Sequence, residues 1–172
     1  AGDAIHVGLD WLASVYFGHV TAVGKRVLVL GGGNTAMDCC RSARRLGGAD
    51  VKVIVRSGFD EMKASPWEKE DAQHEGIPIL DYRVPKTFVH ATGRLTGMTF
   101  EKVRAEYDDR GRRRLVPTGE PDEFHACDEV LIADPDFPQE QAVDLVDRCH
   151  RHGVRVRVAP STMEILMDRV EF

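Results

Sequence analysis

The stretch RVLVLGGGNTAMDCC, residues 26–40, decides how this chain folds. It begins with a continuous apolar run, Val27–Leu30, which is typical of a parallel strand buried on both faces. Three glycines follow this run. Small and apolar side chains then recur at helical spacing from Ala36 to Leu46, while Asp38 and several arginines fall on the opposite face. The stretch therefore predicts a strand, a tight turn and an amphipathic helix.

The rest of the chain continues the alternation of strands and helices. VKVIV, residues 51–55, predicts a second β-branched strand and completes a β-α-β unit of ordinary length. Further parallel strands are expected at IPIL, residues 77–80, at EVLIA, residues 129–133, and at VRVRV, residues 154–158. Alternating arginines in the last of these predict a strand at the edge of the sheet.

Helices are expected between and beyond these strands. Residues 6–18 have the pattern of a short amphipathic helix that ends at Gly18. Ser65 and Glu68 predict a capping box before a helix that ends at Gly76. Two more helices are expected to begin at Asp136 and Ser161.

From Tyr82 to about Val116 the apolar period changes to two, with turns at ATGR and DDRG, which predicts an antiparallel meander. Its middle strand changes phase, and we expect a bulge near Glu101 and Lys102. These elements predict one α/β domain over residues 1–172: a three-layer, Rossmann-like fold with the meander on one side. With the parallel strands numbered along the chain, the expected order in the sheet is 3-2-1-4-5.

The three glycines match a known phosphate-binding pattern. Gly31, Gly33 and Ala36 form G-x-G-x-x-A between a strand and a helix, which is the context of the dinucleotide-binding fingerprint. Gly31 would permit the tight turn, Gly33 would let a pyrophosphate approach the backbone, and Ala36 would let helix and strand pack closely. The start of the helix would then offer free N–H groups to the phosphates. The alternative is a glycine-rich turn that binds nothing.

The residue after the second strand bears on which dinucleotide binds. A carboxylate there suits the ribose hydroxyls of NAD, whereas arginine suits the 2′-phosphate of NADP. This chain has Arg56, followed by Ser57, which favours NADP. The alternative is a solvated surface arginine. Asp134 and Asp136 follow a strand that should end at the same cleft, where they would either cap a helix and shape a turn or repel phosphate.

Residues 25–80 resemble the NADPH-binding domain of glutamate synthase small-chain-like flavoprotein oxidoreductases. The resemblance rests on the octet GGGNTAMD, the arginine after the second strand, the pair EM with a following alanine, and an acidic helix that ends in EGI. It continues to about Ala133. In that family the domain is inserted in an FAD-binding domain and delivers hydride to the flavin, so the resemblance implies a flavin domain as partner.

The resemblance also assigns site residues. It implies that Gly31, Gly33, Asn34, Thr35 and Ala36 line the pyrophosphate and that Arg56 binds the 2′-phosphate, while Ser57 stands where the family commonly has a second arginine. The predicted cofactor-binding set is Gly31, Gly32, Gly33, Asn34, Thr35, Ala36, Arg56 and Ser57. We predict no catalytic residue and no metal site.

From about Asp128 to Phe172 the sequence instead resembles the cytoplasmic Rossmann-like region of bacterial polyprenyl-phosphate sugar-1-phosphate transferases, notably in DEVLIADPDFPQEQ and VRVRVAPSTMEIL. DEVLIA fits both families. This double resemblance predicts an engineered or recombined chimera with a splice near residues 128–134, and the first residue, Ala1, suggests an excised segment.

Composition excludes several classes of partner. The chain has 172 residues, 42% of them hydrophobic, and a net charge of −5, so it offers no electrostatic basis for binding nucleic acid. No apolar run approaches membrane-spanning length, and the N-terminus lacks the pattern of a signal peptide. Four cysteines without CxxC spacing suggest a reducing cytoplasm.

Three functions remain open. The first is an NADP(H)-binding domain that lacks its flavin domain and is inactive alone. The second is a working NADPH-dependent oxidoreductase, although the chain contains no second fingerprint for FAD. The third is a chimeric scaffold that folds and binds no ligand.

Overall fold

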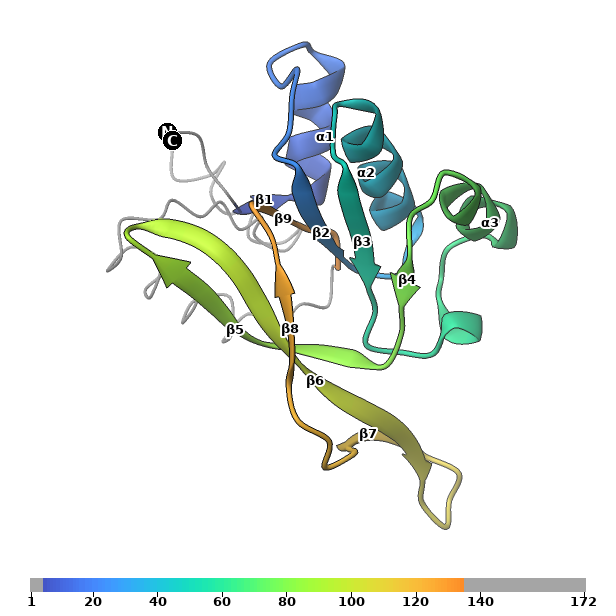
Figure 1. Ribbon diagram of the computed structural model, residues 1–172. Coiled ribbons are helices and arrows are strands. Elements are labelled where there is room, and N and C mark those ends of the chain that lie inside the picture. Colours follow the sequence, from blue (N-terminus) through green and yellow to red (C-terminus); the bar gives the residue numbers. More distant parts are fainter. Residues whose placement is uncertain (1–4, 135–172) are drawn as a thin grey trace, which may run out of the picture.

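The computed structural model describes residues 5–134, which form three α-helices, one 3₁₀ helix and nine strands (Figure 1). In chain order the elements are β1 (Ile5–Val7), α1 (Gly8–Tyr16), β2 (Arg26–Leu30), α2 (Asn34–Arg45), β3 (Asp50–Ile54), η1 (Phe59–Glu61), α3 (Pro66–His74), β4 (Ile79–Leu80), β5 (Arg83–Ala91), β6 (Arg94–Tyr107), β7 (Arg113–Pro117), β8 (Glu123–Ala126) and β9 (Glu129–Ile132). None of these helices is long and apolar enough to cross a membrane.

The parallel sheet has the order β1-β9-β2-β3-β4. β2, β3, β4 and β9 are the four strands predicted within residues 27–133, and their predicted order 3-2-1-4 is confirmed. The place next to β9 on the other side is taken by β1, a strand that the sequence did not predict. Residues 154–158, which were expected there, lie outside the described residues, as do the helices expected from Asp136 and Ser161.

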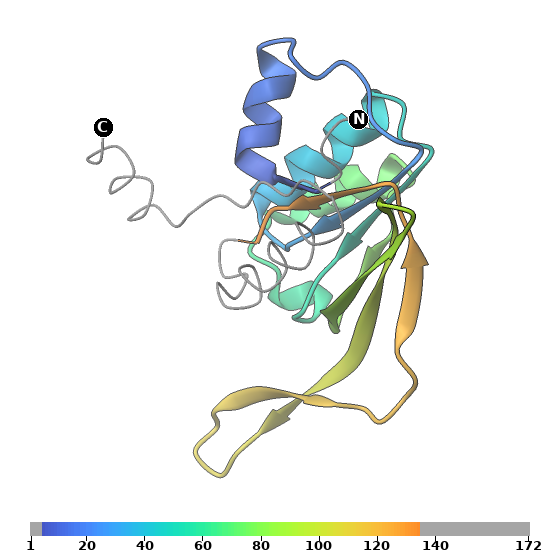
Figure 2. The ribbon, with the colours of Figure 1, turned by 90° about the vertical axis from the view of Figure 1, so that its left-hand side faces the viewer.

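The three-layer architecture is confirmed (Figures 1 and 2). The helices cover one face of the parallel sheet, where Val27, Val29 and Val53 pack against buried residues of α1, α2 and α3. The antiparallel strands cover the other face, where Leu28 and Leu30 share a core with residues of β6. Apolar residues on both faces explain why the strand at residues 27–30 has no polar alternation.

The antiparallel sheet contains β5, β6 and β7, as predicted, and also β8, which was not predicted and which pairs with β6. The phase of β6 does change after Phe100, because its next buried residue is Val103. The expected bulge at Glu101 and Lys102 is wrong: both pair regularly with β5, and the nearest register shift lies between Pro85 and Thr87. The phase changes where β6 leaves β5 and β8 and begins to pair with β7.

The half of β6 that pairs with β7 forms a long hairpin that extends away from the parallel sheet (Figures 1 and 2). Its turn is made by Asp108, which accepts hydrogen bonds from the backbone N–H groups of Arg110 and Arg112. These bonds explain why the predicted turn at DDRG forms.

Helix α2 has the predicted faces, since Ala36, Cys39 and Ala43 are fully buried and Asp38 is exposed. Helix α3 begins after Ser65 with Pro66 in the first turn, as expected. The capping box is wrong, however, because the Ser65 side chain makes no cap bond.

The glutamate of that predicted box has another role. Glu68 forms an ion pair with Arg41 of α2, whose guanidinium also donates to Glu75 at 2.8 Å. These contacts tie the two helices together. Glu68 therefore contacts the neighbouring helix α2 instead of capping the start of its own helix.

Candidate functional site

A cleft of about 670 Å³ lies at the carboxyl ends of the parallel strands. This size is typical of a ligand pocket. Its lining combines the ends of β2, β3 and β9 with η1 and with residues of β5 and β7. The lining residues are Leu30, Gly31, Gly32, Gly33, Thr35, Ile54, Val55, Arg56, Ser57, Glu61, Met62, Lys63, Arg83, Val84, Pro85, Arg113, Leu115, Ala133 and Asp134. Ligands of open α/β sheets bind at this edge.

The glycine-rich turn contributes three glycines with different surroundings. Gly31 has φ +141°, and an added Cβ would lie only 2.8 Å from the Ala133 carbonyl carbon, so a glycine is required where β2 ends beside β9. A Cβ on Gly32 would approach Val55 and Met62. Gly33 differs from both, because nothing lies within 4 Å of a Cβ added to it. The space above Gly33 is therefore open to a ligand.

Helix α2 begins next to this space. Gly33 is its N-cap and no side chain caps the helix, so its first N–H groups are available to an anion. Thr35 lines the cleft and Ala36 is fully buried against the sheet. Asn34 is outside the lining: its side-chain oxygen accepts a hydrogen bond from the Ser65 N–H at 3.0 Å. Asn34 thus fastens the start of α3 to the turn.

The end of β3 places Arg56 and Ser57 in the cleft wall. The guanidinium of Arg56 donates to the carboxylate of Asp134 at 2.5 Å, across 78 residues of sequence. Asp134 follows β9, so the ion pair joins the ends of two strands that are separated by β2. The predicted position of Asp134 at the cleft is confirmed. Its contact with Arg56 was not predicted.

Several charged residues of the cleft were missed by the sequence analysis. Lys63 follows η1, and Arg113 of β7 forms an ion pair with Glu61 of η1 at 2.9 Å. Tyr82 donates a hydrogen bond to the same glutamate. Arg113 belongs to the arginine-rich run RGRRR, residues 110–114, and lines the cleft. Glu61 belongs to the EM pair of the family resemblance, which was the available signal.

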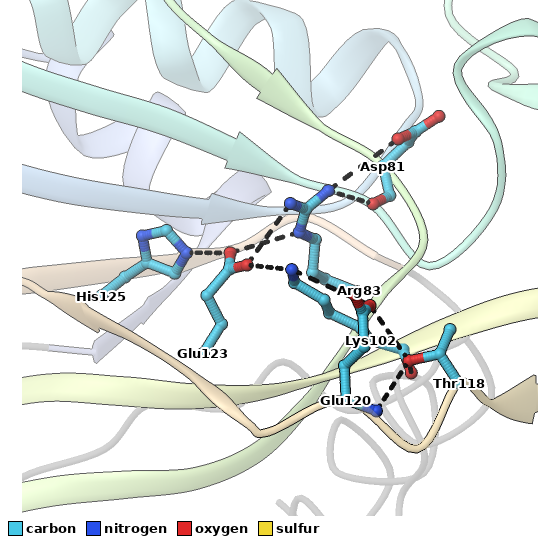
Figure 3. A network of polar contacts seen from close by, with 7 residues as sticks. All are labelled: Asp81, Arg83, Lys102, Thr118, Glu120, Glu123 and His125. Atoms are coloured by element: carbon cyan, nitrogen blue, oxygen red, sulfur yellow. Dashed lines mark hydrogen bonds and ion pairs between the residues drawn. The ribbon is translucent and has the colours of Figure 1, made fainter.

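Arg83 lines the cleft from β5 but is held by a polar network (Figure 3). Its guanidinium donates to Glu123 of β8 and to the backbone carbonyl of Asp81 at 2.7 Å. Glu123 also contacts Lys102 of β6 and His125. Burial alone would raise the pKa of Glu123, but the hydrogen bonds from His125 and Arg83 outweigh it and lower that pKa to about 2. The network joins three antiparallel strands and fixes Arg83 as part of the wall.

No cluster of three metal-ligating side chains occurs within residues 5–134. Cys39, Cys40 and Cys127 are buried, and burial raises the pKa of Cys40 and of Cys127 to about 12. These thiols are therefore protonated near neutral pH and belong to the core. The residues that line the cleft fit a dinucleotide better than a metal: an open glycine turn, an uncapped helix start and more basic than acidic side chains.

The chain resembles segments of redox enzyme subunits. It is 35% identical over 146 residues to the NADPH-Fe(3+) oxidoreductase subunit beta of Geobacter sulfurreducens, covering 80% of this chain and 22% of that protein. It is 44% identical over 112 residues to the NADP(+)-dependent formate dehydrogenase subunit beta of Moorella thermoacetica, covering 64% and 16%. It is 40% identical over 118 residues to the glutamate synthase [NADPH] small chain of Halomonas elongata, covering 67% and 24%. Its homologues are NADPH-dependent oxidoreductase subunits.

The predicted resemblance to glutamate synthase small-chain-like oxidoreductases is thereby confirmed as a similarity to NADPH-dependent oxidoreductase subunits. The chain spans less than a quarter of the length of each of these relatives. No family model matches it. These comparisons do not support the resemblance of residues 128–172 to sugar transferases, and most of that segment lies outside the described residues.

Solved structures show the same fold. The complex of Mycobacterium tuberculosis FprA with NADPH matches with a TM-score of 0.59 at 15% identity, covering 75% of this chain and 44% of that one. The thioredoxin reductase of T. acidophilum matches with a TM-score of 0.56 at 18% identity, covering 78% and 36%. The chain therefore has the Rossmann-type fold found in FAD/NAD(P) oxidoreductases.

Proposed function

We propose that this chain is the NADP(H)-binding domain of a flavoprotein oxidoreductase subunit. The observation that carries the proposal is the open space above Gly33, next to the uncapped start of α2 and in one cleft with Arg56. Two of the relatives bear NADPH in their names and a third bears NADP(+).

Each part of the cleft has a separate task in this proposal. Backbone N–H groups after Gly33 bind the pyrophosphate, and Thr35 lies within the same lining. Arg56 and Ser57 bind the 2′-phosphate at the end of β3, where a guanidinium can donate two hydrogen bonds to a phosphate. Arg83, held by Glu123, and Arg113, held by Glu61, line the same cleft from β5 and β7.

The bound dinucleotide would supply a hydride at its nicotinamide ring. Hydride transfer needs an acceptor that is held close and aligned, and we propose that the flavin domain of a longer protein provides it. By itself the chain would bind the dinucleotide and transfer nothing. The second candidate function is an NADPH-dependent oxidoreductase that works without a flavin domain. Its test is whether the chain oxidises NADPH.

The test is binding of NADPH and NADH to the purified chain, measured by calorimetric titration and by thermal unfolding. A ligand at a hundredfold excess over its dissociation constant adds about 2.7 kcal/mol of stability, which raises the melting temperature of a chain this long by about 5 to 10 °C. NADPH should bind more tightly than NADH.

The variant Arg56→Gln should remove that preference, because it lacks the charged hydrogen bonds to the 2′-phosphate. These are worth about 1.5 to 3 kcal/mol, or about tenfold or more in affinity. Arg104→Gln is the matched control: Arg104 is exposed on β6 and pairs with Glu106, outside the cleft lining. Equal binding of NADPH and NADH by the wild type would contradict the role of Arg56, and binding of neither would leave the scaffold reading.

We also propose that residues 1–172 form one domain with a splice near residues 128–134. Side chains from this segment support its place in the fold. Asp128 pairs with Arg26 of β2 at 2.8 Å, and Glu129 accepts a hydrogen bond from the Gly24 N–H at 2.7 Å. Limited proteolysis should then leave the connection between β8 and β9 intact. Rapid cleavage near residue 128 would contradict the single domain.

A further inference from the structure

The ion pair between Arg56 and Asp134 spans the sheet at the place where the glycine turn begins. β9 and β3 both neighbour β2, so their ends are about 10 Å apart at the usual spacing of strands. The side chains of Arg56 and Asp134 meet across this gap. The backbone of residues 133–134 lies directly against Gly31, since an added Cβ there would be 3.0 Å from the Asp134 amide nitrogen. The pair therefore crosses the end of β2.

Both partners are partly shielded from water. The side chain of Arg56 is 32% exposed and that of Asp134 is 17% exposed. Such a pair is less screened than one on the open surface. Ligand binding at the end of β3 would have to give the guanidinium an equivalent anion in place of the carboxylate.

We propose that Asp134 is an internal competitor of the 2′-phosphate for Arg56 and thereby sets how strongly the chain prefers NADP(H) over NAD(H). This inference rests on the proposed function. In the ligand-free chain the carboxylate of Asp134 is paired with the guanidinium of Arg56. A 2′-phosphate, which carries more charge than a carboxylate, displaces it, whereas a dinucleotide without that phosphate offers Arg56 no replacement. Asp134 thus lowers the affinity for NADP(H), and its removal widens the preference.

The experiment measures dissociation constants for adenosine 2′,5′-bisphosphate, NADPH and NADH with the wild type and with Asp134→Asn. Asparagine keeps the shape and removes the charge. The two 2′-phosphate ligands should bind at least about fivefold more tightly to the variant, as expected when a competing ion pair of about 1 kcal/mol is lost. NADH should change by less than half as much on a logarithmic scale. Asp122→Asn is the matched control, because Asp122 pairs with Lys86 outside the cleft lining and carries the same charge.

A double-mutant cycle makes the assignment specific. In an Arg56→Gln background, Asp134→Asn should no longer change the ratio of NADPH to NADH affinity, because the guanidinium for which the anions compete is absent. If Asp134→Asn does not fold, Asp134→Ser is measured in its place, and the melting temperature of each ligand-free variant is recorded.

Three results would overturn the inference. Unchanged NADPH affinity in Asp134→Asn, with normal preference in the wild type, refutes it and leaves the proposed function standing. An equal gain for NADH and NADPH means that the carboxylate repels phosphates in general and does not compete for Arg56. Failure of all variants and the wild type to bind any of the three ligands refutes the proposed function and the inference together.

Discussion

Replacing Gly31 and Gly33 with alanine, one at a time, separates the folding role of the glycine turn from its binding role. The two residues are only two positions apart and belong to the same fingerprint. The structure nevertheless predicts opposite results. Gly31→Ala should lower stability, whereas Gly33→Ala should leave stability nearly unchanged and weaken dinucleotide binding.

The cost at Gly31 has two sources. Its φ of +141° disfavours any residue with a Cβ, which costs about 1 to 3 kcal/mol. The new methyl group would also lie 2.8 Å from the carbonyl carbon and 2.9 Å from the carbonyl oxygen of Ala133, and overpacking of this kind costs about 1 to 3 kcal/mol. The sum is about 2 to 6 kcal/mol. The melting temperature should therefore fall by about 5 to 20 °C.

Neither source applies to Gly33. Its φ of −98° and ψ of −178° are open to alanine, and an added Cβ meets nothing within 4 Å. Loss of a glycine N-cap and reduced freedom of the unfolded chain act in opposite directions, so the net change should stay within about 1 kcal/mol. The methyl group would, however, stand where the pyrophosphate approaches. NADPH affinity should fall by at least about tenfold.

The assay combines thermal unfolding monitored by circular dichroism with calorimetric titration of NADPH. Gly47→Ala serves as a control, because Gly47 also has a positive φ but no neighbour within 4 Å, so only the backbone cost applies. NADPH binding by Gly33→Ala at wild-type affinity would refute the proposed path of the pyrophosphate. A melting temperature for Gly31→Ala no lower than that of Gly47→Ala would refute the contact with Ala133.

Three further predictions concern pH, thiols and turnover. Because the folded-state pKa of Glu123 is lowered to about 2 from the usual 4.5, its stabilisation is complete above about pH 4.5 and is lost as the pH falls toward 2. Glu123→Gln should flatten this part of the curve of unfolding free energy against pH, and an unchanged curve would contradict the role of Glu123. Cys39, Cys40 and Cys127 should resist iodoacetamide until the chain unfolds, as peptide mapping would show, and fast labelling in native buffer would contradict their burial. NADPH oxidation with added free flavin should not exceed the rate of flavin alone, and a faster rate that Gly33→Ala abolishes would contradict the proposed lack of turnover.

Local patterns were sufficient for the central part of the fold. The apolar run at residues 27–30, the glycines and the helical period after them predict β2, the turn and α2, because each is specified by residues close together in the chain. The alternation of strands and helices then predicted the order of four parallel strands. The same reasoning identified Gly33 and Arg56 as residues of one cleft, since both follow neighbouring strands.

Features that depend on contacts between distant residues were missed. β1 has only three residues and pairs with β9, more than a hundred positions away, so no local period announces it. β8 is a short strand held by β6 and by the network around Glu123. The capping box at Ser65 was wrong for a related reason. The Ser65 N–H, which the box would give to Glu68, donates to Asn34, and Glu68 pairs with Arg41 of another helix.

The cleft shows the same division. From the sequence alone, the glycine turn and an arginine at the end of the second parallel strand could be placed, because strand, turn and helix signals are local. Which charges face one another was decided by the tertiary structure: Arg56 meets Asp134 across 78 residues, and Arg113 reaches Glu61 from a distant hairpin. Such pairs depend on how strands and layers pack. The hydrophobic periodicity of a sequence does not indicate which partner a charged side chain near the surface will contact.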